Sequence, residues 1–173
     1  MAHFNDCAKL VSAETLEPAT QAYIDAKSNG EDPLNIMLSM QQSLQTRLSS
    51  DKPYIPNPKN LETAGDVLKW MQYQDDCIAD ETRELYTALG GMSNGEKNAS
   101  GIWKKWKSNH VELQNVKVVD MSPEDQLEIK FELVDQFHFF MCKFLALGMD
   151  AQEIFELYYL KNKENFARQD NGY

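Results

Sequence analysis

The chain has 173 residues, of which 42% are hydrophobic and 25% charged, and its formal net charge is −10. This length favours a single domain over residues 1–173, the apolar content excludes global disorder, and the negative charge disfavours binding to duplex nucleic acid. No apolar run reaches the roughly 18–20 residues of a membrane span, and the polar first residues do not resemble a signal peptide, so a cytoplasmic protein is expected.

Helical periodicity predicts an all-α protein, a compact bundle of about five main helices. The first helix is expected over about 13–28 and the second over about 33–50. Residues 51–60 hold three prolines and should form a rigid extended loop. A long third helix is expected over about 61–89, ended by two glycines.

The second half of the chain predicts two more long helices. Residues 92–101 are polar and are expected to be mobile, and the sequence IWKKWK at 102–107 suggests a short helix. Ser122-Pro123 is a strong helix start, so a fourth helix should run to Leu147. Asp150 should cap a fifth helix that continues almost to the C-terminus.

Two acidic motifs, Glu81-x-x-Glu84 and Glu132-x-x-Asp135, lie on largely apolar helices. Residues three apart project from the same side of a helix, so each motif presents a pair of carboxylates toward the protein interior. Buried carboxylates need a cation, and a set of oxygen ligands suits Mg²⁺ or Mn²⁺ better than zinc. The alternative is the wet side of an amphipathic helix, and Glu128, on the same stripe, fits that alternative equally well.

A basic and amide-bearing group stands near the C-terminus. Lys161, Asn165 and Arg168 share one helical face, and Tyr173 follows the expected helix end. Such donors suit the oxygens of a di- or triphosphate, although a solvated helix end would look similar. The IWKKWK segment could bind single-stranded nucleic acid, but a lid over a phosphate or simple packing of its tryptophans is the better interpretation.

Together these motifs resemble the all-α dimeric dUTPases, within the wider all-α nucleoside triphosphate pyrophosphatases. The stretches QDDCIADETRELYTALGGMSNGEK, SPEDQLEIKFELVDQFHFFM and YYLKNKENFARQDNGY are most similar to the T-even bacteriophage branch. That resemblance implies Mg²⁺-dependent hydrolysis of dCTP and dUTP, with Mn²⁺ as a substitute, to the monophosphate and pyrophosphate. The diphosphates dCDP and dUDP are further candidate substrates.

The resemblance also assigns roles to individual positions. It implies that Glu81, Glu84, Glu132 and Asp135 hold the metal and act in catalysis, with Glu81 or a neighbour orienting the attacking water. It implies phosphate contacts from Lys161, Asn165, Arg168 and Tyr173. Candidate base and sugar contacts are Gln41, Gln45, Trp70, Trp103 and His138. The family pattern has an Asn near Gln45, and this departure is one place where acceptance of cytosine could arise.

The same resemblance implies a homodimer in the cytoplasm of an infected bacterium, where the enzyme would remove dCTP from the DNA precursor pool. Association with other nucleotide-synthesis enzymes is a further expectation. Three alternatives stay open: a dUTPase without dCTP activity, a general pyrophosphatase for damaged nucleotides, and a non-enzymatic helical subunit of a nucleotide-synthesis assembly.

Overall fold

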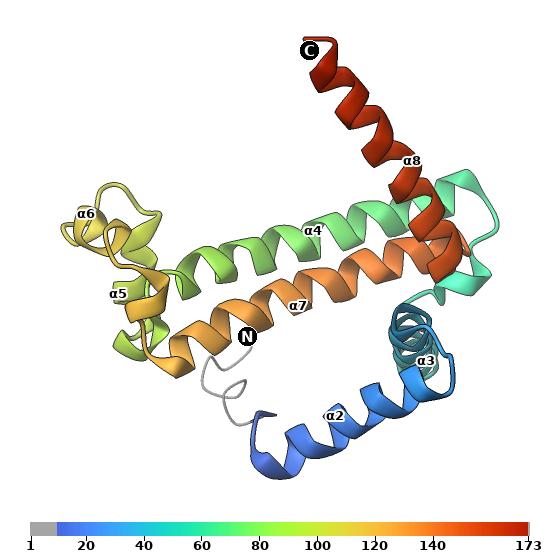
Figure 1. The fold of residues 1–173 in the computed structure, drawn as a ribbon, viewed down its shortest axis with the longest axis horizontal. Coiled ribbons are helices and arrows are strands. Elements are labelled where there is room, and N and C mark those ends of the chain that lie inside the picture. The colour runs from blue at the N-terminus through green and yellow to red at the C-terminus, as the bar shows by residue number, and fades with distance from the viewer. Residues whose placement is uncertain (1–9, 173) are drawn as a thin grey trace. The chain divides into compact units, whose positions relative to one another are not determined.

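The computed structural model describes residues 10–172, and within that range it contains helices and turns but no strand (Figure 1). The long helices are α2 (Ala13–Ser28), α3 (Pro33–Asp51), α4 (Ala64–Ala88), α7 (Pro123–Ala146) and α8 (Ala151–Asp170). The all-α prediction is therefore confirmed. The largest shift in a helix bound is at the start of α4, which was expected near residue 61. Among the described residues, no helix is long and apolar enough to cross a membrane.

Local signals explain where these helices begin. Asp32 caps α3 by accepting a hydrogen bond from the Leu34 amide at 2.8 Å, and Pro33 occupies the first helical position. Asp150 caps α8 by accepting from the Glu153 amide at 2.9 Å. The prolines after α3 permit only turns and the 3-10 helix η1 (Pro58–Asn60), as expected for a chain that cannot continue a helix.

The segment between α4 and α7 differs from the sequence-based expectation. Short helices follow one another there: η2 (Met92–Asn94), α5 (Glu96–Ala99), η3 (Ser100–Ile102), α6 (His110–Gln114) and η4 (Val118–Asp120). The supposedly mobile stretch is thus helical and partly buried, and most of IWKKWK forms turns instead of a helix. The reason is tertiary: a Cβ added at Gly90 would lie 2.0 Å from the Ala99 carbonyl oxygen, so the chain is folded closely on itself.

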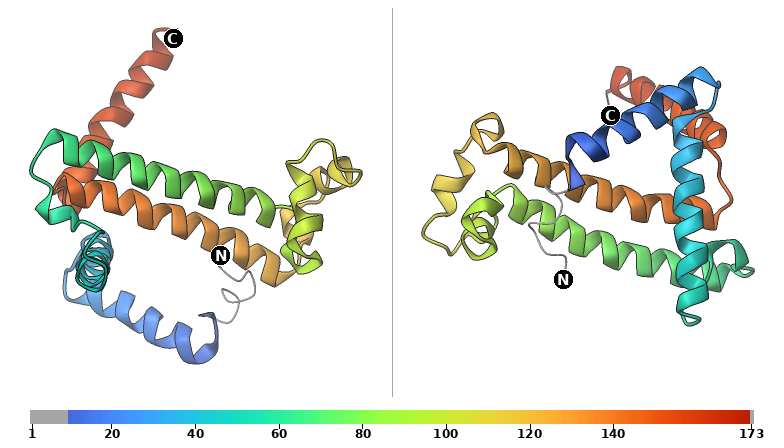
Figure 2. Two further views of the ribbon diagram at one scale, coloured as in Figure 1. Left: turned by 180° about the vertical axis from the view of Figure 1, so that it is seen from behind. Right: turned by 90° about the horizontal axis from the view of Figure 1, so that it is seen from below.

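The chain divides into two compact units, which we describe separately. The first comprises, of the described residues, 10–22 and 72–140. In it, the parts of α4 and α7 from 72 to 88 and from 123 to 140 lie side by side and antiparallel, with the short helices at one end (Figures 1 and 2). Asp125 joins that end to α7 by accepting bonds from the amide and the hydroxyl of Ser93, both at 2.7 Å.

The second unit comprises residues 23–71 and 141–172 of the described range. Helix α3 crosses the first turns of α4 and the last turns of α7 (Figure 2). Gln41 Nε2 donates to Cys142 Sγ at 3.1 Å, and Trp70 Nε1 donates to the Cys142 carbonyl at 3.0 Å. The Asn35 side chain accepts from the Ala151 amide at 3.0 Å, which joins the start of α3 to the start of α8.

Candidate metal centre

Three acidic side chains from two helices meet in the first unit. One carboxylate oxygen each from Glu81 of α4 and from Glu132 and Asp135 of α7 lie within 4.8 Å of one another. Glu84 follows Glu81 on the same side of α4, outside this three-residue group. The structure thus brings three of the four motif carboxylates together, and we call these three the acidic triad.

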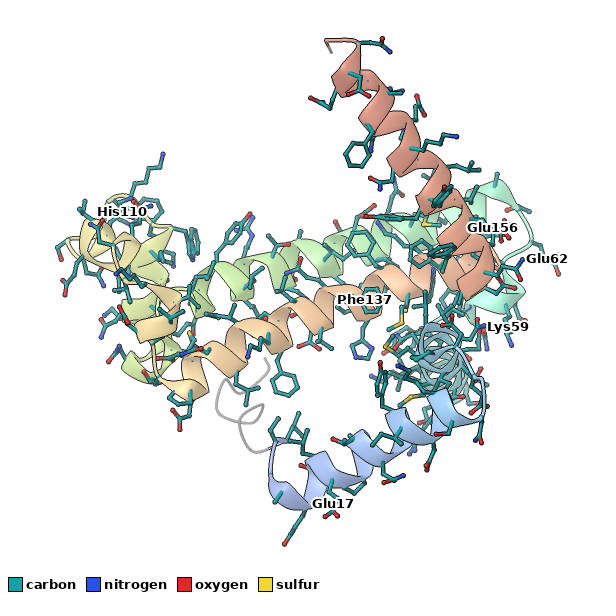
Figure 3. The ribbon with its side chains drawn as sticks, viewed as in Figure 1. Glu17, Lys59, Glu62, His110, Phe137 and Glu156 are labelled. Carbon is teal, nitrogen blue, oxygen red and sulfur yellow. The ribbon has the colours of Figure 1, made fainter. Side chains whose placement is uncertain are left out.

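Helix α7 presents its acidic stripe inward. Glu128 and Glu132 are each only 4% exposed, whereas the apolar residues on the opposite side are largely exposed. These exposed residues, which we call the α7 apolar face, are Leu133, Val134, Phe137 and Phe140. Figure 3 labels Phe137 midway along the helix. The usual polarity of a helix is therefore reversed here, because polar side chains normally face solvent.

Burial and mutual repulsion hold these carboxyls toward their protonated forms. Burial, followed by the charges of Glu84 and Asp135, raises the pKa of Glu81 to about 7. Burial, followed by the charges of Glu84 and Glu128, raises the pKa of Glu132 to about 8. Burial also raises the pKa of Glu84, Glu128 and Asp135, although His138 acts in the opposite direction on Asp135.

The residues present fit a hard divalent cation. No described lysine or arginine forms an ion pair with these five carboxylates. The Oε2 atom of Glu132 is buried and has no hydrogen-bond partner among the described residues. A buried carboxylate oxygen without a donor needs either a proton or a cation, and a triad built only of oxygen ligands fits Mg²⁺ or Mn²⁺.

The predicted phosphate-binding residues lie on α8, in the second unit. Lys161, Asn165 and Arg168 are exposed, and Glu164 pairs with both cations: its Oε2 is 3.3 Å from Lys161 Nζ, and its Oε1 contacts the Arg168 guanidinium. A shallow hollow of about 410 Å³ is lined by Asn162, Asn165, Phe166, Arg168 and Gln169. Tyr173 lies outside the described residues.

The predicted base and sugar residues fall into two groups. Gln41, Gln45 and Trp70 are buried in the second unit, where Gln41 and Trp70 contact Cys142. Trp103 and His138 belong to the first unit and are half-buried. Trp103 Nε1 donates to Thr87 Oγ1 at 3.0 Å, and Lys104 Nζ lies 4.7 Å from the centre of the Trp103 ring.

The burial of Glu128 and the ion pairs of Glu164 were not predicted from the sequence. Glu128 was as compatible with a solvated side chain as with a buried one, yet it is as buried as Glu132. Its position four residues before Glu132 was the available signal. Glu164 was not among the candidate site residues, although its spacing of three and four residues from Lys161 and Arg168 predicts ion pairs along one helical face.

The raised pKa of Glu132 predicts that the metal-free protein loses stability as pH rises. In the unfolded chain this carboxyl ionises near its ordinary value of 4.5, whereas the folded protein holds the proton up to about pH 8. The folded state binds more protons between these values, so the free energy of unfolding falls across that window. Urea denaturation in a metal chelator measures this fall, and Glu132→Gln should reduce its size.

The matched control for that measurement is Glu124→Gln, which removes an exposed carboxylate from the first turn of the same helix. This variant should keep the wild-type pH dependence. An unchanged pH dependence in Glu132→Gln would show that Glu132 is ionised at neutral pH without a metal ion.

Comparison with known proteins places the chain among phage proteins. It is 64% identical to the dCTP pyrophosphatase of Enterobacteria phage LZ5 and 58% identical to the dCTP pyrophosphatase of Enterobacteria phage T4, in both cases over all of both chains. A longer DNA replication protein of phage T4 is 57% identical over 94% of this chain and 41% of its own length. No family model and no solved structure matches the chain. With identity at this level over the full length of both relatives, the chain belongs to the dCTP pyrophosphatase family of T4-type phages.

Proposed function

We propose that this protein hydrolyses dCTP to dCMP and pyrophosphate in a reaction that requires Mg²⁺, and that dUTP is a second substrate. The observation that carries the proposal is the acidic triad, with Glu132 buried, Glu81 and Asp135 half-buried, and no lysine or arginine partner among the described residues. The activity named for both full-length relatives supports dCTP as the substrate. The dUTP activity rests on the resemblance to the dimeric dUTPases alone.

The carboxylates of the first unit would hold the metal. Glu81, Glu84, Glu132 and Asp135 supply the oxygen ligands, and bound Mg²⁺ would neutralise phosphate charge and lower the pKa of a coordinated water. Glu81 is half-buried, so water can reach its carboxylate, which would orient the attacking water and accept its proton. The water oxygen forms a bond to the α-phosphorus, and the bond from that phosphorus to the oxygen bridging to the β-phosphate breaks.

The cations of α8 would receive the triphosphate. Lys161 and Arg168 offer the charge, and Asn165 an amide donor, that oxygens of the departing pyrophosphate require. In the structure both cations are paired with Glu164. A nucleotide would therefore compete with Glu164 for them.

A panel of deoxynucleoside triphosphates tests the base selectivity. Release of pyrophosphate from dCTP and dUTP, with little from the purine nucleotides, is the expected result. Turnover of dUTP alone would favour a dUTPase, equal turnover of all bases would favour a general pyrophosphatase, and absence of Mg²⁺-dependent turnover would favour the non-enzymatic subunit.

Replacing Glu81 tests the catalytic assignment. Glu81→Gln keeps the shape of the side chain but removes the charge, so dCTP hydrolysis should fall by roughly 10²–10⁴-fold. The measurement is pyrophosphate release at saturating Mg²⁺. Asp76→Asn, an exposed carboxylate earlier in α4, is the control and should keep full activity. Near wild-type turnover in Glu81→Gln would overturn the assignment.

Removing Glu164 should strengthen substrate binding. Two exposed ion pairs, each weak because solvent screens its charges, must yield when phosphate oxygens replace the carboxylate. Glu164→Gln should therefore lower KM for dCTP by about two- to fivefold at low salt, with kcat unchanged. Glu156→Gln is the control because Glu156 is exposed on the same helix and accepts a hydrogen bond from Gln152. A higher KM in Glu164→Gln would show that this acid holds the cations in their binding conformation.

We propose that the protein is a homodimer, as the resemblance implies. Support comes from the α7 apolar face and from α8, where Phe155 is 67% and Tyr158 68% exposed. Monomeric proteins rarely leave such large apolar patches in contact with water. Sedimentation equilibrium should give twice the mass of the chain, and Phe137→Glu should shift the equilibrium toward monomer. A wild-type monomer at micromolar concentration would contradict the proposal.

A further inference from the structure

Glu128 is a buried carboxylate that the four-residue acidic pattern does not include. It lies on α7, one helical turn before Glu132, and is 4% exposed. No described residue donates a hydrogen bond to it or forms an ion pair with it. Asp125, three residues earlier and just as buried, is different, because Ser93 donates two hydrogen bonds to its oxygens. Burial disfavours the ionised form of a carboxylate that has no such donor.

The surroundings of Glu128 are acidic on both helices. Buried Asp125 and Glu132 flank it on α7, three residues before it and four residues after it. The charges of Glu128 and of Glu84, which belongs to α4, both act on Glu132. Glu132, a member of the acidic triad, is therefore surrounded by further acids from both helices.

The orphaned oxygen of Glu132 is an independent indication of a ligand. Its Oε2 is buried without a hydrogen-bond partner among the described residues, although the residue is almost fully enclosed. A carboxylate has two oxygens and can serve two neighbouring cations or bind one in bidentate fashion. Either arrangement would place positive charge within one helical turn of Glu128.

We propose that Glu128 is a fifth metal-holding carboxylate of this centre and binds a divalent cation together with Glu84 and Glu132. The cation class is Mg²⁺ or Mn²⁺, since the donors are oxygens only. The role rests on the proposed function, because it presumes that the acidic triad is a metal centre. It extends that centre by one helical turn toward the start of α7.

The test compares divalent-cation binding in the wild type and in Glu128→Gln without nucleotide. Mn²⁺ binding, followed by electron paramagnetic resonance, should weaken by at least about 10-fold in the variant. The rise in melting temperature caused by Mn²⁺ should shrink in parallel. In dCTP hydrolysis, the Mg²⁺ concentration for half-maximal activity should rise by a similar factor, while saturating Mg²⁺ restores most of kcat.

Two further variants make the result specific. Glu124→Gln, exposed one turn earlier on the same helix, should bind Mn²⁺ like the wild type. Glu128→Asp keeps the charge but shortens the side chain by one methylene, so its affinity should be intermediate. It also serves as the test should Glu128→Gln fail to fold, which circular dichroism would reveal.

The outcomes separate this proposal from the proposed function. Wild-type Mn²⁺ affinity in Glu128→Gln, accompanied by greater stability of the metal-free variant, would overturn the role of Glu128 and make it a buried protonated acid. Absence of both Mn²⁺ binding and dCTP hydrolysis in the wild type would instead overturn the metal centre as a whole.

Discussion

The first unit is organised around carboxylates enclosed between α4 and α7. Most helix pairs bury apolar side chains at their contact, whereas this pair encloses Glu132 and Glu128 and places Glu81 and Asp135 beside them. Burial, followed by the charges of neighbouring acids, raises the pKa of Glu81 and Glu132, so the carboxylates repel one another when they are ionised. Protons or a cation must supply the missing positive charge.

The burial of these carboxylates also determines which side chains of α7 are exposed to solvent. The circumference of one helix is limited, and when acids occupy the inner side, the apolar residues must lie on the outer side. Leu133 and Phe137 are accordingly exposed, although residues of these types are normally interior. If the acidic triad binds a metal and the α7 apolar face contacts a second subunit, as proposed, one helix serves both, and a change at the interface would reach the site through a single turn of helix.

The long helices and the inward direction of the α7 acidic motif were predictable from sequence, whereas the exposure of the α7 apolar face and the fold of residues 92–114 were not. Caps such as Asp150 act locally, so the start of α8 follows from a few neighbouring residues. A helical wheel gives the angular position of each residue but does not show which helix packs against it. Because apolar residues lie nearly all round α7, the wheel could not show which of them stay exposed. The short helices depend on contacts distant in sequence, such as Trp103 with Thr87 and Ser93 with Asp125. Acids three residues apart located the candidate site; the burial of Glu128 needed the structure.

The charge balance of the site couples its ligands. Glu81, Glu84, Glu128, Glu132 and Asp135 would carry five negative charges if all were ionised, and one divalent cation offsets only two. A nucleoside triphosphate adds more negative charge, which the protein can accept only with further cations or retained protons. If the site binds a divalent cation as proposed, metal and nucleotide should favour each other's binding, and by linkage the two effects are equal in free energy. On this proposal the surplus of acid would make metal occupancy depend on substrate, since the ionised site without metal repels a triphosphate more strongly than the metal-loaded site does.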